Sequence, residues 1–333
     1  MSRRTALVER EGAEVLVVLK HVEVRAVADA SVQPGAELRG VVGGGGDVAR
    51  AVPSELGRIK NLVHINLRRN SLTGQIPDEL GDMNSEGYEK LLEFDLGVND
   101  FDGTIPPTLS KLTDLTLLDL AHNRLTGPLP NELTNLSALQ ALFVTNNSLG
   151  GAIPVDLGQM KELRYLDAST NQISGTIPPS IGGCRELQEL RMSQNRITGD
   201  IPPQIGNIWG LTELRFDDNE LTANFSNGNG AAAIGNLGRL LTLDLYNNKM
   251  VGDLPDSIQN LTSLQYMYVQ NEHLLPLRRK FCGQRIPNNG KYNWRIVRDE
   301  YHQMMGLHCP EGVIHDTAFT FNSLQASGVF DSE

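Results

Sequence analysis

Apolar and polar residues alternate along most of this chain in one recurring order. The order is L-x-x-L-x-L-x-x-N, with Ile, Val, Met or Phe at some of the Leu positions. In its central part, as in Leu118-Asp119-Leu120, two apolar residues flank a polar one, which is typical of a short β-strand with one buried face. Each copy therefore predicts a strand whose apolar residues point into a core and whose intervening residue faces solvent.

The copies follow one another at a regular period. The closing Asn recurs after 24 residues in five intervals and after 29 in two. Because a unit of this length cannot close a core of its own, successive units must stack, and their strands then form one parallel sheet. We expect the longer intervals to hold insertions, at 82–90 and 224–235, that bulge away from the sheet.

A second signature follows the Asn in most copies. It has the form L-x-G-x-I-P, as in the six residues from Ile173 to Pro178. Gly permits a tight bend, and Pro begins a helical turn while it ends strand pairing. One coil thus consists of a strand, a bend and a short helical turn, which predicts an α/β fold.

The Asn lies where the chain turns after each strand. Its side-chain amide can donate to, and accept from, buried backbone groups that no strand reaches. Stacked copies then form a structural ladder, and the loss of one partner costs about 1 to 3 kcal/mol. The predicted ladder consists of Asn70, Asn99, Asn123, Asn147, Asn171, Asn195, Asn219 and Asn248.

The two signatures together resemble the plant-type subclass of leucine-rich repeats, whose 24-residue unit carries the L-x-G-x-I-P extension. That family includes receptor-like kinase ectodomains, receptor-like proteins and polygalacturonase inhibitors. The resemblance implies a right-handed solenoid of about nine repeats, with a concave parallel sheet, short convex helices or 3-10 turns, and terminal caps. It also implies a protein or peptide ligand.

The pattern divides the chain into three parts. The repeats run over 52–277, and a basic, aromatic segment at 278–333 predicts a C-terminal cap and tail. Residues 1–51 are predicted to be an N-terminal cap or a poorly ordered segment. Within them, Val15 to Leu19, followed by Val22 and Val24, has the apolar character of strands.

Composition narrows the choice of partner. The net charge is −11, from 29 basic and 40 acidic residues, which disfavours nucleic acid and anionic membrane surfaces. No apolar run is long enough to insert into a membrane, and neither a signal peptide nor a cysteine-bearing N-terminal cap is visible. These features favour a cytoplasmic monomer, whereas an incomplete N-terminus would make the protein extracellular.

The residues that could carry chemistry predict no metal, no cofactor and no catalysis. Cys184 is expected to be a buried, reduced thiol, and whether Cys282 and Cys309 pair stays open. The histidines near Cys309 fit no zinc spacing. Asp95, Asp119 and Asp167 share a column on an open surface, where we expect nothing to raise a pKa, so we expect no enzyme.

The residues between buried strand positions form an outward face that can be followed coil by coil. Two aromatic clusters lie on it, with two arginines between them, and aromatic residues and Arg usually carry interface energy. The predicted partner-binding residues are Phe143, Tyr165, Asp167, Arg191, Arg215, Tyr246, Tyr266 and Tyr268.

Two interpretations of this face stay open. In the first, a protein or peptide partner occupies it from Phe143 to Tyr268. In the second, the Arg and Glu rows neutralise one another across adjacent strands as a solvated ladder. An alternative function, inhibition of a secreted glycosidase, needs a basic spot on the concave face, for which only Arg191 and Arg215 are available.

Overall fold

The computed structural model describes residues 7–11, 14–19, 22–28, 36–41, 51–58, 62–83, 90–225, 229–252, 255–269 and 273–274. These residues belong to one compact unit, 1–274. The predicted C-terminal cap, with Cys282 and Cys309, and most of the first insertion lie outside the described residues. Within them, no helix is long and apolar enough to cross a membrane.

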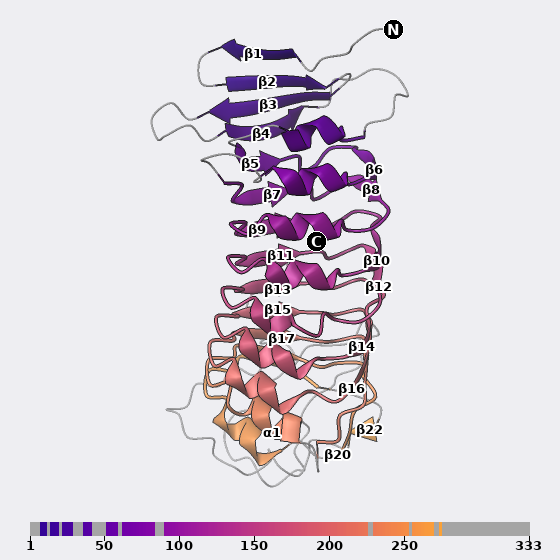
Figure 1. Ribbon diagram of the computed structural model, residues 1–333. Helices are drawn as coiled ribbons and strands as arrows, with labels where there is room; N and C mark the ends of the chain where they lie inside the picture. Colours follow the sequence, from indigo (N-terminus) through magenta and orange to yellow (C-terminus); the bar gives the residue numbers. More distant parts are fainter. Residues whose placement is uncertain are drawn as a thin grey trace, which may run out of the picture. The chain divides into compact units, whose positions relative to one another are not determined.

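Nine short parallel strands, one per coil, form the main sheet of the described repeats (Figure 1). Each strand pairs with the strand of the next coil, so residues one repeat apart become direct neighbours. The strands are β5 (Leu62–Asn66), β7 (Glu93–Asp95), β9 (Leu117–Asp119), β11 (Ala141–Phe143), β13 (Tyr165–Asp167), β15 (Glu189–Arg191), β17 (Glu213–Arg215), β19 (Thr242–Asp244) and β21 (Tyr266–Tyr268).

The predicted strand alternation is confirmed by the burial of the side chains. Leu190 and Met192 are buried on either side of Arg191, which is half-buried on the other face of the sheet. The core is mainly Leu and Ile, with Phe94 and Phe216 among the fully buried side chains. Each fully buried Leu or Ile contributes about 1.5 to 3 kcal/mol relative to an exposed one, so the stacked coils share one apolar core.

The second signature gives each coil its bend and its helical turn. Gly175 has a φ of 76°, which Gly adopts without strain, and Pro178 lies directly before a 3-10 helix. The 3-10 helices are η1 (Ser54–Arg58), η2 (Asp78–Asp82), η3 (Pro107–Lys111), η4 (Asn131–Asn135), η5 (Leu157–Gln159), η6 (Pro179–Gly183), η7 (Pro203–Asn207) and η8 (Asp256–Asn260). They stack in a row behind the main sheet (Figure 1).

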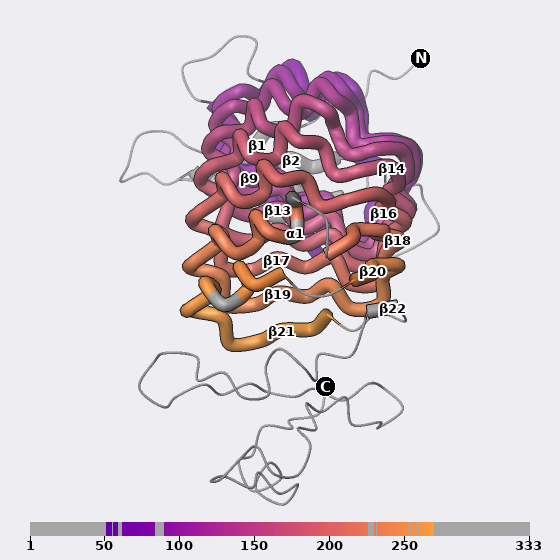
Figure 2. The backbone as a smooth tube through the Cα atoms, turned by 90° about the horizontal axis from the view of Figure 1, so that it is seen from below, coloured from indigo at the N-terminus to yellow at the C-terminus, as the bar shows by residue number. Residues whose placement is uncertain are grey.

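Short parallel strands also form at the bends, on a different side of the coil from the main sheet (Figure 2). They are β6 (Thr73–Gln75), β8 (Asp100–Asp102), β10 (Thr126–Pro128), β12 (Ser148–Gly150), β14 (Ser174–Thr176), β16 (Arg196–Gly199), β18 (Glu220–Leu221), β20 (Val251–Gly252) and β22 (His273–Leu274).

The described part of the second insertion lies away from the main sheet, as expected. It forms α1 (Asn229–Ile234), which packs between η7 and η8 in the row of helical turns. The insertion thus replaces a 3-10 helix with a short α-helix and leaves the register of β17 and β19 unchanged.

The N-terminal residues extend the main sheet. They form β1 (Leu7–Glu11), β2 (Glu14–Leu19), β3 (Val22–Ala28) and β4 (Ala36–Val41), which pair antiparallel to one another. β4 pairs in parallel with β5. β2 and β3 cover the two segments whose apolar character predicted strands.

Candidate functional site

The candidate site is the solvent-facing surface of the main sheet from β11 to β21. In its central column Phe143 pairs with Asp167, Asp167 with Arg191, and Arg191 with Arg215. The column continues through Asp244 to Tyr268. Side chains that are far apart in the sequence therefore form one continuous row.

The N-terminal end of this surface carries two aromatic side chains and a small residue. Phe143 and Tyr165 are half-buried, and Ala141, which pairs with both Leu117 and Tyr165, is buried. The Tyr165 hydroxyl donates to Gln188 Oε1 at 3.3 Å. Phe143, Tyr165 and Ala141 therefore form an apolar spot on this face, in which a hydrogen bond orients the Tyr165 ring.

The tyrosines lie at the other end of the surface. Tyr266 and Tyr268 are half-buried on β21, and Tyr246 is 37% exposed. Tyr268 pairs with Asp244 of β19, and Tyr246 lies two residues after the end of that strand. The three tyrosines therefore share one end of the sheet face.

The two arginines between the aromatic clusters are engaged by carboxylates. Arg191 donates from Nε and Nη2 to the two carboxylate oxygens of Glu213, at 2.9 and 2.8 Å, and lies 2.8 Å from Glu189 Oε2. Arg215 Nε also forms an ion pair with Glu213. The ion pairs expected from the solvated-ladder interpretation are thus present, although they do not exclude a ligand.

These pairs change the ionisation of both partners. The hydrogen bond from Arg191 to Glu213 raises the pKa of Arg191. Burial opposes the ionisation of Glu213, yet the hydrogen bonds and charges of Arg191 and Arg215 hold its pKa below its ordinary value. Because bidentate Arg–carboxylate pairs are geometrically specific, this part of the surface is fixed before any partner arrives.

The expectation that nothing raises a pKa on this open surface is wrong for Asp95, and Asp244 in the same column also departs from it. Burial, followed by the charge of Asp217, raises the pKa of Asp244 to about 7. Burial also raises the pKa of Asp95, with a further contribution from the charge of Asp119 and against the hydrogen bond from the Gly97 N–H. The alternation of side chains shows which face a carboxylate occupies, but not how deeply its neighbours cover it.

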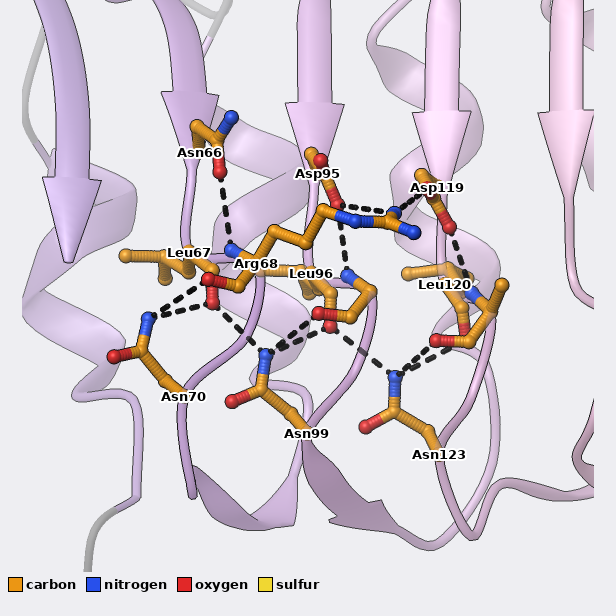
Figure 3. A network of polar contacts seen from close by, with 12 residues as sticks. Asn66, Leu67, Arg68, Asn70, Asp95, Leu96, Asn99, Asp119, Leu120 and Asn123 are labelled. Carbon is orange, nitrogen blue, oxygen red and sulfur yellow. Dashed lines mark hydrogen bonds and ion pairs between the residues drawn. The ribbon is translucent and has the colours of Figure 1, made fainter. Parts of the chain in front are cut away.

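Arg68 lies over two carboxylates of this column, Asp95 and Asp119. Its side chain runs along the face from the first described coil and forms ion pairs with Asp95, at 3.5 Å, and Asp119 (Figure 3). Asp119 is only 7% exposed. A Cβ atom at Gly97 would lie 2.6 Å from Arg68 Nη1, so the missing side chain at Gly97 leaves room for this contact.

Sequence reasoning did not identify Arg68, because it lies two residues beyond the column that the pattern defines. The sequence did hold a sign of this contact. Arg68 follows Asn66 by two residues and so lies on the same face, and Gly97 occupies the equivalent position of the next coil. An Arg beside a Gly on one face indicates that a long side chain can cross to the neighbouring coil.

Several Asp and Asn side chains of the central column accept a hydrogen bond from the backbone N–H two residues further along the chain. Asp167 Oδ1 accepts a hydrogen bond from the Ser169 N–H at 2.9 Å, and Asp95 Oδ1 accepts one from the Gly97 N–H at 2.9 Å. Asn66 makes the equivalent contact with the Arg68 N–H (Figure 3). Only part of the Asp167 carboxylate is therefore open to a ligand.

The asparagines that end the strands bond to the backbone of two coils. Asn171 Nδ2 donates to Ala168 O and Ser169 O in its own coil and to Val144 O in the preceding coil, while its Oδ1 accepts from the Leu149 N–H. Asn99 and Asn123 repeat this arrangement of donor bonds (Figure 3). Among the described residues, Asn70 Nδ2 donates to Leu67 O and Arg68 O of its own coil.

The remaining sequence predictions on chemistry fall partly within the described residues. Cys184 is a free, fully buried thiol, and burial raises its pKa to about 12, as expected for an unreactive core cysteine. Across the described residues, no group of three or more His, Cys, Asp or Glu side chains could hold a metal ion.

Comparison with protein families agrees with this geometry. A family model described as Leucine Rich Repeat matches residues 61–83, 114–136, 162–184, 186–208 and 239–261. The chain is a leucine-rich-repeat protein of the plant type. Its concave parallel sheet, 3-10 turns and stacked coils are those of a leucine-rich-repeat solenoid.

Solved structures of the same fold come from plants. The plant peptide hormone receptor RGFR1, solved with RGF2, is 31% identical to this chain at a TM-score of 0.61. The match covers 67% of this chain and 34% of that one. The ectodomain of the receptor kinase GASSHO1/SCHENGEN3 from Arabidopsis thaliana, solved with CASPARIAN STRIP INTEGRITY FACTOR 2, is 29% identical at a TM-score of 0.61. That match covers 75% of this chain and 31% of that one.

A third similar structure has a different function. A plant ice-binding protein is 25% identical at a TM-score of 0.59, and the match covers 75% of this chain and 76% of that one. The leucine-rich-repeat solenoid spans about a third of the length of the two receptor ectodomains. The shared repeats thus establish the fold, while ligands differ among proteins that have it.

Proposed function

We propose that this solenoid is a non-catalytic module that binds a protein or peptide segment along the main sheet, from Phe143 to Tyr268. The observation that carries the proposal is the pair of aromatic groups at the two ends of one continuous face. Partly covered aromatic side chains offer large, rigid apolar contact areas at low entropic cost. The peptide ligands of the two similar receptor ectodomains support the same class of ligand.

The ion pairs in the middle of the face define how such a ligand would bind. Arg191 and Arg215 share Glu213, and Arg191 also pairs with Glu189, so the four side chains would meet a ligand as a neutral, pre-arranged group rather than as free cations. A partner would gain apolar contacts at Phe143 and Tyr165 and at the tyrosines, and hydrogen bonds between them. Because the pairs are already formed, the ligand would not have to order them.

The glycosidase-inhibitor alternative receives no similar support. It needs a basic spot on this face, and Arg191 and Arg215, the two arginines that the described strands from β11 to β21 place there, are both engaged by carboxylates. The protein- or peptide-binding function therefore remains the one that the geometry supports best.

Removal of the apolar spot tests the proposal. The double variant Phe143→Ala/Tyr165→Ala should lose the bound partner, because its two aromatic contact surfaces are gone; a loss of about 2 kcal/mol or more per hot-spot residue is typical. Both proteins would be used for affinity capture from an extract of the source organism, with mass spectrometry to identify what binds.

Val155→Ala provides the matched control, because Val155 is 65% exposed and precedes η5 in the row of helical turns. A captured protein is accepted as a partner only if both the wild type and Val155→Ala bind it. If a folded double variant captures the same proteins as the wild type, the sheet face is not the binding surface.

A further inference from the structure

The turns that lead from the helical row into the main strands form a second surface. Arg164, Gln188, Thr212 and Leu241 immediately precede strands of the main sheet, and backbone hydrogen bonds of 2.8 Å join each to the next. Trp209 and Arg239 lie on the turns just before Thr212 and Leu241. We call Arg164, Arg185, Trp209, Arg239 and Leu241 the turn edge.

Two apolar side chains of the turn edge face solvent. Trp209 is 59% exposed and Leu241 39%, and they belong to adjacent coils. The Arg239 guanidinium lies 5.7 Å from the centre of the Trp209 ring, within the range of a cation–π contact. A Cβ atom at Gly238 would meet no atom within 4 Å, so the surface beside this pair is open.

The charges of the turn edge differ from those of the sheet face. In the described part of the chain, Arg68, Arg191 and Arg215 on the sheet face all form ion pairs. By contrast, none of the three arginines of the turn edge forms an ion pair with a described residue, and Arg164 Nε is buried without a hydrogen-bond partner. The exposed Trp209 thus lies beside the Arg239 guanidinium, which forms no ion pair with a described residue.

The same turns carry two carboxylates, Glu162 and Glu186, which are fewer than the cations around them. Lys161 adds a fourth positive charge to the three arginines. A surface of this composition complements carboxylates that flank an apolar residue.

We propose that the turn edge is a second binding surface, which takes an acidic segment of a partner protein and packs an apolar residue of that segment on Trp209 and Leu241. The carboxylates of the segment would pair with Arg185 and Arg239. An anionic membrane is a poorer occupant, because the turn edge offers only one Trp and one Leu for insertion.

Two short synthetic peptides of equal length test the proposal, one with alternating Glu and Leu and the other with alternating Lys and Leu. Fluorescence anisotropy of the labelled peptides on the full chain should show saturable binding of the acidic peptide alone. Trp209→Ala should raise its Kd about tenfold or more. Arg239→Glu should abolish binding, whereas Arg239→Lys should retain part of it.

Val155→Ala serves as the control for removal of an exposed apolar side chain and should leave the Kd unchanged. Phe143→Ala/Tyr165→Ala should also leave the Kd of the acidic peptide unchanged. That result would show that the peptide binds to the turn edge and not to the sheet face. Thermal melting would show that each variant is folded.

Four results would overturn the proposal. The first is that the basic peptide binds as well as the acidic one, and the second is that Trp209→Ala has no effect on the Kd. The third is that phosphatidylserine vesicles bind to the wild type but not to Trp209→Ala, which would make the edge a membrane contact. The fourth is self-association that Trp209→Ala abolishes, which would make a second copy the occupant.

Discussion

At the scale of single residues, the terminal asparagines act between coils rather than within one. The Asn171 amide serves three carbonyl oxygens and one N–H, and the Val144 carbonyl belongs to the preceding coil. Each of the three carbonyl oxygens also accepts a hydrogen bond from another group, whereas the Leu149 N–H donates to Asn171 Oδ1. A side chain that replaces the amide therefore takes the acceptor from the Leu149 N–H and one donor from each carbonyl.

Asn171→Ala should therefore destabilise the fold without altering the sheet face. We expect a loss of about 1 to 3 kcal/mol in the free energy of unfolding, measured by urea denaturation. Asn207→Ala, at an exposed position that ends η7, is the matched control and should change the stability by less than about 0.5 kcal/mol. Equal midpoints for the wild type and Asn171→Ala would contradict a stabilising ladder.

At the scale of elements, the stacked 3-10 helices depend on Gly at their closest approach. A Cβ atom at Gly182 in η6 would lie 2.5 Å from Gln204 O in η7, and one at Gly206 in η7 would lie 2.7 Å from Ala233 O in α1. Gly57, Gly81, Gly158 and Gly235 show the same kind of clash with the backbone of the next coil. The helical row can stack this tightly because these residues have no side chain.

Gly182→Ala should separate η6 from η7 and cost about 1 to 3 kcal/mol, as overpacking usually does. The measurement is the unfolding midpoint in denaturant. Gly210→Ala is the control, because a Cβ atom there meets nothing closer than 3.8 Å. The explanation fails if the two variants are equally stable.

Adjacent strands also create a pH dependence. The pKa of Asp244 on β19 is raised to about 7 from 3.8, first by burial and then by the charge of Asp217 beyond β17. An acid with a raised pKa in the folded state holds its proton more firmly there than in the unfolded chain. Its contribution to stability is therefore greatest below 3.8 and is lost as the pH rises towards 7.

Asp244→Asn should remove this loss. The amide keeps an oxygen that can accept the hydrogen bond from the Tyr246 N–H but carries no charge. We expect the variant to melt at a higher temperature than the wild type above about pH 7, with a difference that shrinks as the pH falls towards 3.8. A difference that stays constant over this range would show that Asp244 does not titrate as described.

At the scale of the whole molecule, the repeat presents two surfaces of different character. On the sheet face, carboxylates neutralise the arginines and the aromatic groups lie at the ends. On the turn edge, an exposed Trp209 lies beside the Arg239 guanidinium, and the three arginines form no ion pair with a described residue. The first surface suits an extended segment with apolar side chains and the second an acidic one, so the two experiments above address separate partners.

The sequence by itself determined the coil: its period, its strand, the bend at Gly, the short helical turn after Pro and the columns of outward-facing residues. These features depend on local backbone preference and on the alternation of side chains, which repeat with the chain. Only the tertiary structure decided that Glu213 engages Arg191, that Arg68 covers Asp119 above Gly97, and that Trp209 stays exposed. Those outcomes depend on the reach and size of side chains in neighbouring coils, and a periodic pattern does not specify either.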